Sequence, residues 1–132
     1  MADEQVGIDT EDAVRVFIRV RPLNKREKLG NETFAWSHNK TSLLEETQNG
    51  QRVYAYDRCY GPDDYNNLVY QEVGKPTVLK CMEGFNGTVF TYGQTGSGKT
   101  YSMRGCEEDP GMMMLCIKDI FDFIDQHKER EY

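Results

Sequence analysis

The sequence predicts an α/β fold in which helices flank a central, mainly parallel β-sheet. Two observations predict this fold class. The first is the order of the elements expected between residues 52 and 103, which is strand, helix, strand, loop and helix. The second is a glycine-rich loop between a β-branched, aromatic strand, Thr88 to Tyr92, and the start of a helix, Lys99 to Met103. Such an order requires crossover helices, which make consecutive strands parallel.

The chain opens with Met1 to Asp12, which carries five carboxylates and few apolar residues. We predict a disordered acidic tail there, because such a segment has too little apolar surface to fold. Residues 13–132 are then predicted to form one unit of domain size. Its first strand is expected at Val14 to Arg21, where valine and isoleucine alternate, and should end at Pro22, which cannot continue a β-ladder.

Short β-structure is expected before residue 61. Asn24 to Asn31 is rich in charge and is predicted to be a loop. Thr33 to Trp36 and Ser42 to Glu45 can pair as a hairpin, and Arg52 to Tyr56 alternates as a further strand. The residues Gly61 to Asp64 are typical of a turn.

Helical spacing dominates the second half of the chain. From Asn66 onward the apolar residues suit a helix, but Pro76 lacks the N–H that would bond to the carbonyl of Glu72. Two short helices and one kinked helix both remain open. Gly105 to Gly111 is acidic and turn-like. Met112 to Ile124 has apolar residues near helical spacing, and its methionine run is expected to fill the core.

The composition, with 29% charged and 38% hydrophobic residues among 132, is ordinary for a soluble protein. No apolar run approaches the ~20 residues of a membrane span, and the acidic opening lacks the pattern of a secretory signal. The net charge of −6 argues against nucleic acid as a partner. The four cysteines show no metal-ligand spacing, so we expect them to be reduced and to form no zinc site.

The glycine-rich loop matches the pattern G-x-x-x-x-G-K-S/T at every position. Its members are Gly93, Gln94, Thr95, Gly96, Ser97, Gly98, Lys99 and Thr100. A strand that turns through glycines into a helix directs backbone N–H groups and the helix dipole at one point, which suits the oxygens of a triphosphate. Gly96 and Gly98 are expected to adopt positive φ, Lys99 to reach the β- and γ-phosphates, and Thr100 to bind Mg²⁺. The loop therefore predicts a site for ATP or ADP with Mg²⁺.

Three segments resemble those of one known family. They are VRPLN at Val20 to Asn24, Tyr56-Asp57-Arg58 together with Gly61-Pro62-Asp63, and FNGTVFTYGQTGSGKTYSM around the glycine-rich loop. From about Ala13 to its last residue the chain resembles the N-terminal part of a kinesin motor domain. Its VRVRPLN-type spacing and the ending HKEREY are similar to the centromere-associated kinesins. The resemblance implies a P-loop NTPase fold of kinesin type, with only the N-terminal portion present.

The resemblance implies a microtubule-dependent ATPase that couples ATP hydrolysis to movement along microtubules, in the cytoplasm, on the cytoskeleton and on the spindle. It also implies that Arg19, Pro22 and Tyr101 enclose the adenine. Arg19 and Pro22 match the family's R-x-R-P, and Tyr101 takes the aromatic position beside the base. Without the family, Arg19 is an exposed strand residue and Pro22 a strand stop. A dimer would form through a coiled coil outside this chain.

The chain departs from the family pattern in two places. Met112 to Met114 stand where the family has Ile-Ile-Pro, so we expect altered packing there and intact nucleotide contacts. Neither switch motif of the family, N-x-x-S-S-R-S-H or D-x-x-G, occurs in the 132 residues. We therefore expect no catalytic residue in this chain, a tubulin-binding surface outside it, and no activity of the chain alone. The alternative function is a truncated nucleotide-binding module without motor or ATPase activity.

Overall fold

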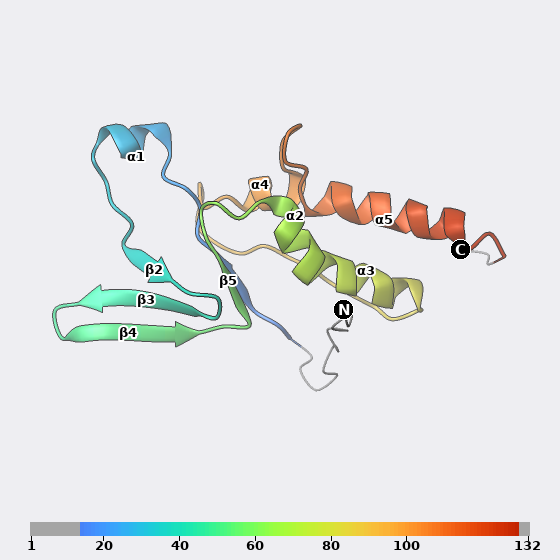
Figure 1. The fold of residues 1–132 in the computed structure, drawn as a ribbon, viewed down its shortest axis with the longest axis horizontal. Helices are drawn as coiled ribbons and strands as arrows, with labels where there is room; N and C mark the ends of the chain where they lie inside the picture. The colour runs from blue at the N-terminus through green and yellow to red at the C-terminus, as the bar shows by residue number, and fades with distance from the viewer. Residues whose placement is uncertain (1–13, 130–132) are drawn as a thin grey trace, which may run out of the picture. The chain divides into compact units, whose positions relative to one another are not determined.

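The computed structural model describes residues 14–129, so the predicted acidic tail, Met1 to Asp12, lies outside the described residues. The chain divides into two compact units, Met1–Pro62 and Asp63–Tyr132 (Figure 1). Over residues 14–62 the first unit consists of strands and one short helix, and over residues 63–129 the second consists of helices joined by irregular segments. Within the described range, every helix is too short or too polar to span a membrane.

A short parallel ladder in the first unit agrees with the predicted direction of the strands. In it, β1 (Phe17–Arg19) pairs with β5 (Arg58–Tyr60). The ladder is shorter than the predicted strand Val14 to Arg21, because β5 offers only three residues to pair with. β5 itself was missed, since three residues are too few to show an alternating pattern. Its residues Cys59 and Tyr60 are buried, so this ladder forms the core of the unit.

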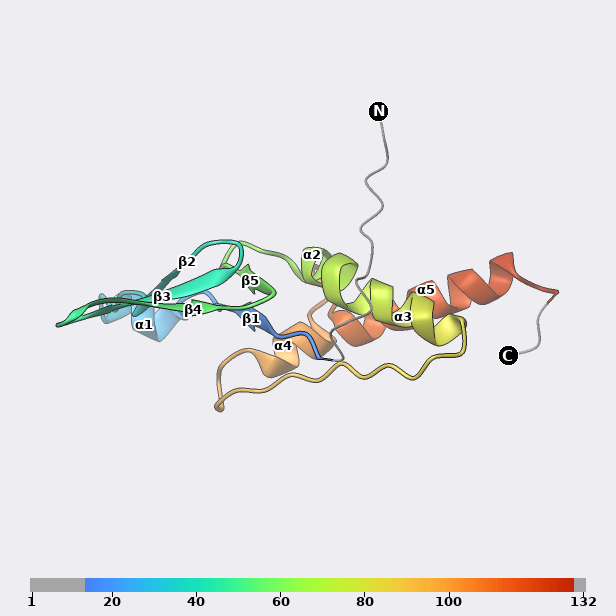
Figure 2. The ribbon, with the colours of Figure 1, turned by 90° about the horizontal axis from the view of Figure 1, so that it is seen from below.

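The first unit also contains an antiparallel sheet of three strands, seen edge-on in Figure 2. Its strands are β2 (Trp36–His38), β3 (Ser42–Thr47) and β4 (Gly50–Ala55), in that order. The ring of Trp36 packs edge-to-face on that of Tyr54, with centroids 5.6 Å apart. The predicted hairpin and the strand that follows it are therefore confirmed, with displaced ends.

The prediction of a loop at Asn24 to Asn31 is wrong, because the segment contains the helix α1 (Lys25–Leu29). The side chain of Asn24 accepts a hydrogen bond from the backbone N–H of Glu27 at 2.9 Å. The carboxylate of Glu27 accepts one from the backbone N–H of Asn24 at 2.8 Å. This reciprocal capping box satisfies two N–H groups and stabilises so short a helix. An Asn-x-x-Glu signature was present in the sequence, within a run of charged residues.

The second unit begins with one continuous helical run, which excludes two separate helices. It consists of α2 (Asn66–Val69), the π-helical turn η1 (Tyr70–Gly74) and α3 (Lys75–Met82). Pro76 is the second residue of α3 and follows the π-helical turn. The N–H of Lys75 bonds to the carbonyl of Tyr70, five residues earlier. The widened turn thus accommodates the proline, as π-bulges do in other helices.

Two further helices follow, α4 (Lys99–Arg104) and α5 (Met112–Gln126), with a β-bridge between Gly105 and Pro110 in the loop that joins them. Both views show α3 running alongside α5 (Figure 1, Figure 2). Among residues 63–129 the buried apolar residues are Val69, Tyr70, Val78 and Met112. The methionine run was expected to fill the core, but only Met112 is buried, so that prediction is right for one residue of three.

The predicted central strand Thr88 to Tyr92 is not formed, and this prediction is corrected. The segment is irregular and pairs with neither of the two sheets. Phe90 and Tyr92 expose 79% and 96% of their surface. A strand requires a neighbour to exchange backbone hydrogen bonds with, and the described part of the chain offers this segment none. The sequence pattern identified a strand-forming segment, and the missing partner decides that it stays irregular.

Candidate functional site

The glycine-rich loop has the backbone conformation that its motif requires. Gly93, Gly96 and Gly98 all have positive φ, of 150°, 82° and 96°. Gly98 is left-handed and directly precedes the first residue of α4, so it makes the turn from loop to helix. A Cβ at Gly93 would lie 2.6 Å from the Oγ of Ser97. The loop therefore closes on itself too tightly for a side chain at this glycine.

Lys99 folds back across the loop. Its Nζ donates hydrogen bonds to the carbonyl oxygens of Gly93 at 2.6 Å and Gln94 at 2.8 Å. The N–H of Ser97 donates to the same Gln94 carbonyl at 3.2 Å. The ammonium group is thus held by backbone oxygens inside the loop, at the point where the helix begins. A cation in this position is attractive to an anion that approaches the loop.

The remaining loop residues differ in exposure. Gly93, Ser97, Gly98 and Lys99 are half-buried, whereas Gln94, Thr95, Gly96 and Thr100 are exposed. Thr100 lies in the first turn of α4, whose leading N–H groups have no carbonyl partner within the helix. Its hydroxyl and the neighbouring N–H groups suit Mg²⁺ and phosphate oxygens respectively. Among residues 14–129, no group of three or more His, Cys, Asp or Glu could hold a metal.

The three residues expected to enclose adenine come from both units. Arg19 is the last residue of β1 and Pro22 follows it in the first unit, whereas Tyr101 belongs to α4 in the second. The adenine site therefore stays a prediction. Tyr101 has an exposed fraction of 43%, and its hydroxyl donates to the Asp109 carboxylate at 2.6 Å. Tyr101 is thus partly exposed and held at its hydroxyl end.

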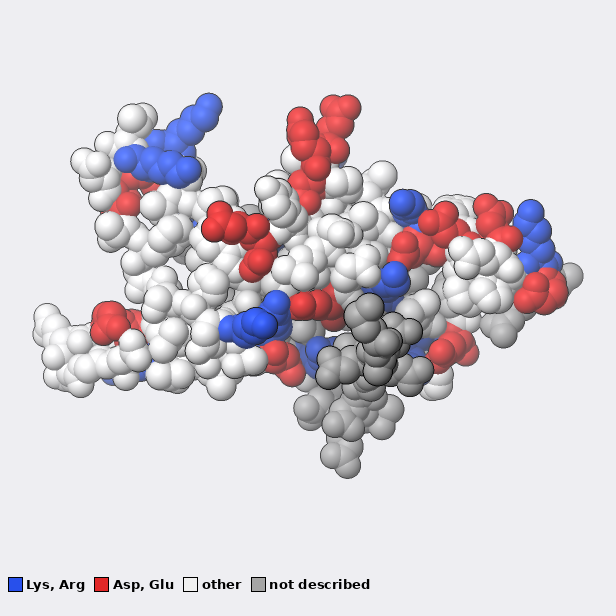
Figure 3. Space-filling view, viewed as in Figure 1, with Lys and Arg blue, Asp and Glu red and all other residues white. Residues whose placement is uncertain are grey.

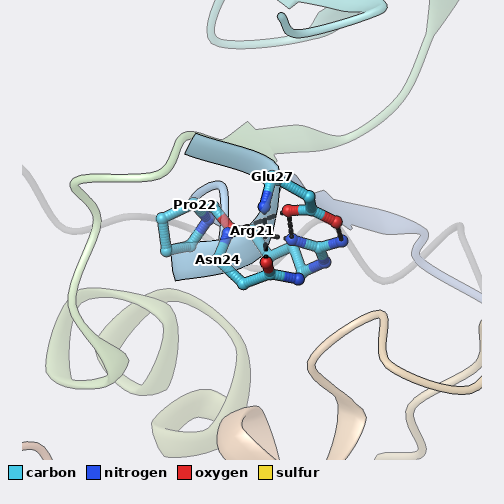
Figure 4. Close-up of polar contacts among 4 residues, drawn as sticks. All are labelled: Arg21, Pro22, Asn24 and Glu27. Carbon is cyan, nitrogen blue, oxygen red and sulfur yellow. Dashed lines mark hydrogen bonds and ion pairs between the residues drawn. The ribbon is translucent and has the colours of Figure 1, made fainter. Parts of the chain in front are cut away.

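Sequence reasoning overlooked the second arginine of R-x-R-P. Arg21 forms a two-point ion pair with Glu27, at 2.5 and 2.7 Å, and donates to the carbonyl oxygen of Pro22 at 2.9 Å (Figure 4). The hydrogen bonds from Arg21, and then the backbone bond from Asn24, lower the pKa of Glu27 from 4.5 to about 2. Arg21 therefore joins the segment at Pro22 to the start of α1.

Sequence reasoning also missed Asp109 and Asn66, which are both buried in the second unit. The backbone N–H of Asn66 donates to the carboxylate of Asp109, which lies 43 positions later in the chain. No local spacing reveals a contact over that distance in sequence. Asp109 was included in an acidic turn, where solvated carboxylates are the ordinary expectation.

Comparison with known proteins identifies the family. The model of the kinesin motor domain matches residues 19–132. Kinesin-like protein KIN-7D, mitochondrial, of Arabidopsis thaliana is 40% identical over 121 residues, 92% of this chain and 12% of its own length. Kinesin-related protein 4 of Dictyostelium discoideum is 44% identical over 120 residues, 90% of this chain and 6% of its own length.

A solved structure described as KIF14 (391–755), ADP in complex with a microtubule, shares the fold at 32% identity and a TM-score of 0.79. The match covers 86% of this chain and 34% of that one. This chain thus spans about an eighth or less of the two curated relatives named above and about a third of the solved neighbour. Both the sequence match and the shared fold cover most of the residues described above. The chain therefore belongs to the kinesin motor-domain family, and its α/β fold is the N-terminal portion of that domain.

Proposed function

We propose that the residues Gly93 to Thr100 bind the phosphates of ATP and ADP together with Mg²⁺. The observation that carries the proposal is the conformation of the loop. Its three glycines have positive φ, and it leads directly into α4 at Lys99. In the neighbouring KIF14 structure, whose match covers 86% of this chain, ADP is the bound nucleotide. A complete G-x-x-x-x-G-K-T sequence in this conformation is best explained as a phosphate site.

Each residue type has a distinct part in the proposed binding. The exposed N–H groups at the start of α4 donate to phosphate oxygens, with the helix dipole adding positive potential. Lys99 exchanges its bonds to the Gly93 and Gln94 carbonyls for stronger, charge-assisted bonds to the β- and γ-phosphates. Thr100 contributes its hydroxyl to Mg²⁺, which supplies charge neutralisation when it is bound. Of the residues expected to contact the base, Tyr101 directly follows Thr100 in α4, and its side chain is partly exposed.

The whole protein that carries this chain is proposed to be a microtubule motor driven by ATP hydrolysis. Family membership and the microtubule in the KIF14 complex support this activity. Such a motor is proposed to act in the cytoplasm, on the microtubule cytoskeleton. Tubulin contacts, the switch motifs and any coiled coil for dimerisation are proposed to lie in sequence beyond these 132 residues. The alternative is a module that binds ATP without hydrolysing it. A measurement of ATP hydrolysis by the full-length protein distinguishes the two functions.

The test of the phosphate site is Lys99→Ala in the full-length protein, with titration of ATP and measurement of hydrolysis. The substitution removes charge-assisted hydrogen bonds worth roughly 1.5 to 3 kcal/mol, so it should lower the affinity for ATP at least about tenfold or stop ATP hydrolysis. Lys80→Ala is the matched control, because Lys80 pairs with Glu83 on the surface of α3. It should behave as wild type. Unchanged affinity and turnover in Lys99→Ala would refute the assignment.

A further inference from the structure

A buried carboxylate outside the glycine-rich loop holds the hydroxyl of Tyr101. Asp109 has an exposed fraction of 8%, and its Oδ2 accepts the hydrogen bond from Tyr101 at 2.6 Å. The neighbouring Glu107 and Glu108 are exposed, and acidic side chains project from this loop between α4 and α5 in Figure 3. Asp109 is therefore buried, whereas its two acidic neighbours in this loop are exposed to solvent.

Asn66 completes the network around Asp109 and is itself only 1% exposed. Its backbone N–H donates to both carboxylate oxygens of Asp109 at 3.1 Å. Its side-chain amide donates to the main-chain oxygens of Asp109 at 3.0 Å and Tyr101 at 3.3 Å. Asn66 is the first residue of α2, so the carboxylate also lies at the positive end of a helix dipole. Asp109 is consequently held in place by charge-assisted bonds that a solvated carboxylate would lack.

This network determines how the Tyr101 ring is presented. The hydroxyl is fixed at the buried carboxylate, while 43% of the residue stays exposed. A tyrosine side chain has two torsions, so fixing its far end restricts the ring to one orientation. Tyr101 follows Lys99 and Thr100 directly in α4, and the ring is therefore oriented relative to the phosphate loop.

We propose that Asp109, held by Asn66, is a positioning residue that presents the partly exposed side chain of Tyr101 to the base of a bound nucleotide. The inference rests on the proposed function, because it needs a nucleotide with its phosphates in Gly93 to Thr100. It goes further by making affinity for the base depend on a buried carboxylate that does not touch the ligand. A ring that is already oriented loses less conformational freedom when a base stacks on it.

The test compares ADP with inorganic tripolyphosphate, which has phosphates and no base, in the full-length protein. Tyr101→Phe keeps the ring and removes the hydroxyl, and Asp109→Asn keeps the shape and removes the charge. Each substitution should lower the affinity for ADP about three- to tenfold and leave the affinity for tripolyphosphate unchanged. The double variant should bind ADP no more weakly than the weaker-binding single variant, because both substitutions disrupt the same hydrogen bond between Tyr101 and Asp109. Glu108→Gln, at an exposed neighbour, is the control and should bind ADP as wild type does.

The outcomes separate this inference from the proposed function. A wild-type protein that binds neither ADP nor tripolyphosphate overturns both. If the wild type binds both ligands, two results overturn the inference alone. Either the variants lose affinity for ADP and tripolyphosphate by the same factor, or they bind ADP as tightly as the wild type does. Equal weakening would mean that Asp109 only supports the fold of α4 and the loop. If Asp109→Asn does not fold, Tyr101→Phe decides the question with the same pair of ligands.

Discussion

At the scale of single residues, the loop depends on backbone angles that only glycine adopts without strain. Gly98 has φ of 96° and is the residue from which α4 starts. A side chain there would meet the steric penalty of the left-handed region, about 1–2 kcal/mol. The same angle orients the N–H groups of the first helical turn. Stability and the proposed phosphate binding are therefore expected to depend on the same residue.

We predict that Gly98→Ala lowers the free energy of unfolding by about 1–2 kcal/mol and weakens tripolyphosphate binding. Denaturant unfolding and ligand titration of the full-length protein measure the two effects. Gly30→Ala is the matched control, since Gly30 has φ of −77° and a Cβ there would come no closer than 3.4 Å to another atom. Equal effects of the two substitutions would show that the left-handed angle is unimportant.

At the scale of elements, short helices in this chain are stabilised by specific contacts at their ends. α1 has five residues, none of them buried, and it is held by the capping box and by the Arg21–Glu27 ion pair. Isolated helices of this length are unstable in water. The state of the Glu27 carboxylate therefore decides whether α1 forms.

The pH dependence of α1 follows from the pKa of Glu27, which is lowered from 4.5 to about 2. Its stabilising contribution is complete above pH about 4.5 and is lost as the pH falls through about 2, where the folded form takes up the proton. NMR titration should place the Glu27 midpoint near the lower value. Arg21→Gln should move that midpoint upward, because Arg21 is the largest cause of the shift, whereas Arg26→Gln on α1 should not. A midpoint near 4.5 in the wild type would contradict the ion pair.

The close packing of η1 on α5 at Gly74 leads to a prediction about stability. A Cβ at Gly74 would collide with the Sδ of Met112 and the ring of Tyr70, both buried. Overpacking of this kind costs about 1–3 kcal/mol, so Gly74→Ala should lower the denaturation midpoint. Adding Met112→Ala should recover part of the loss by making room. If Gly74→Ala were as stable as wild type, α5 would have to pack on η1 less closely.

At the scale of the whole molecule, the described residues leave large apolar side chains in water. Phe90, Tyr92 and Phe121 have exposed fractions of 79%, 96% and 63%. The first two belong to the segment that the sequence predicts as a central strand. An unpaired, apolar segment of this kind is open to association with other chains. The chain matches 34% of the solved KIF14 chain, and the switch motifs expected of the family are not in these 132 residues.

We predict that purified residues 1–132 show no microtubule-stimulated ATPase and do not sediment with microtubules beyond controls. Phosphoryl transfer needs an oriented water and neutralised charge as well as a phosphate cradle. Amide exchange should find little protection in Thr88 to Tyr92, which has no ladder partner among residues 14–129. The full-length protein is the positive control for both assays. A soluble fragment with stimulated turnover and a protected segment would mean that these residues form a self-sufficient motor.

The sequence by itself identified the glycine-rich loop, because its glycines, Lys99 and Thr100 lie within eight consecutive residues and its conformation depends on local backbone geometry. It also determined the family, since the motif and its flanks are contiguous. The strands and long helices were largely found from periodicity. The errors at α1 and β5 arose in short elements, where capping and pairing outweigh the pattern of apolar residues.

Only the tertiary structure decided what depends on residues far apart in the chain. The predicted strand Thr88 to Tyr92 stays irregular because strand formation needs a partner, and no local sequence supplies one. The role of Asp109 became visible only when folding brought it to Asn66, 43 residues away, and to the hydroxyl of Tyr101. Burial turns that carboxylate from one charge in an acidic loop into a fixed acceptor, because a charge removed from water must be paired.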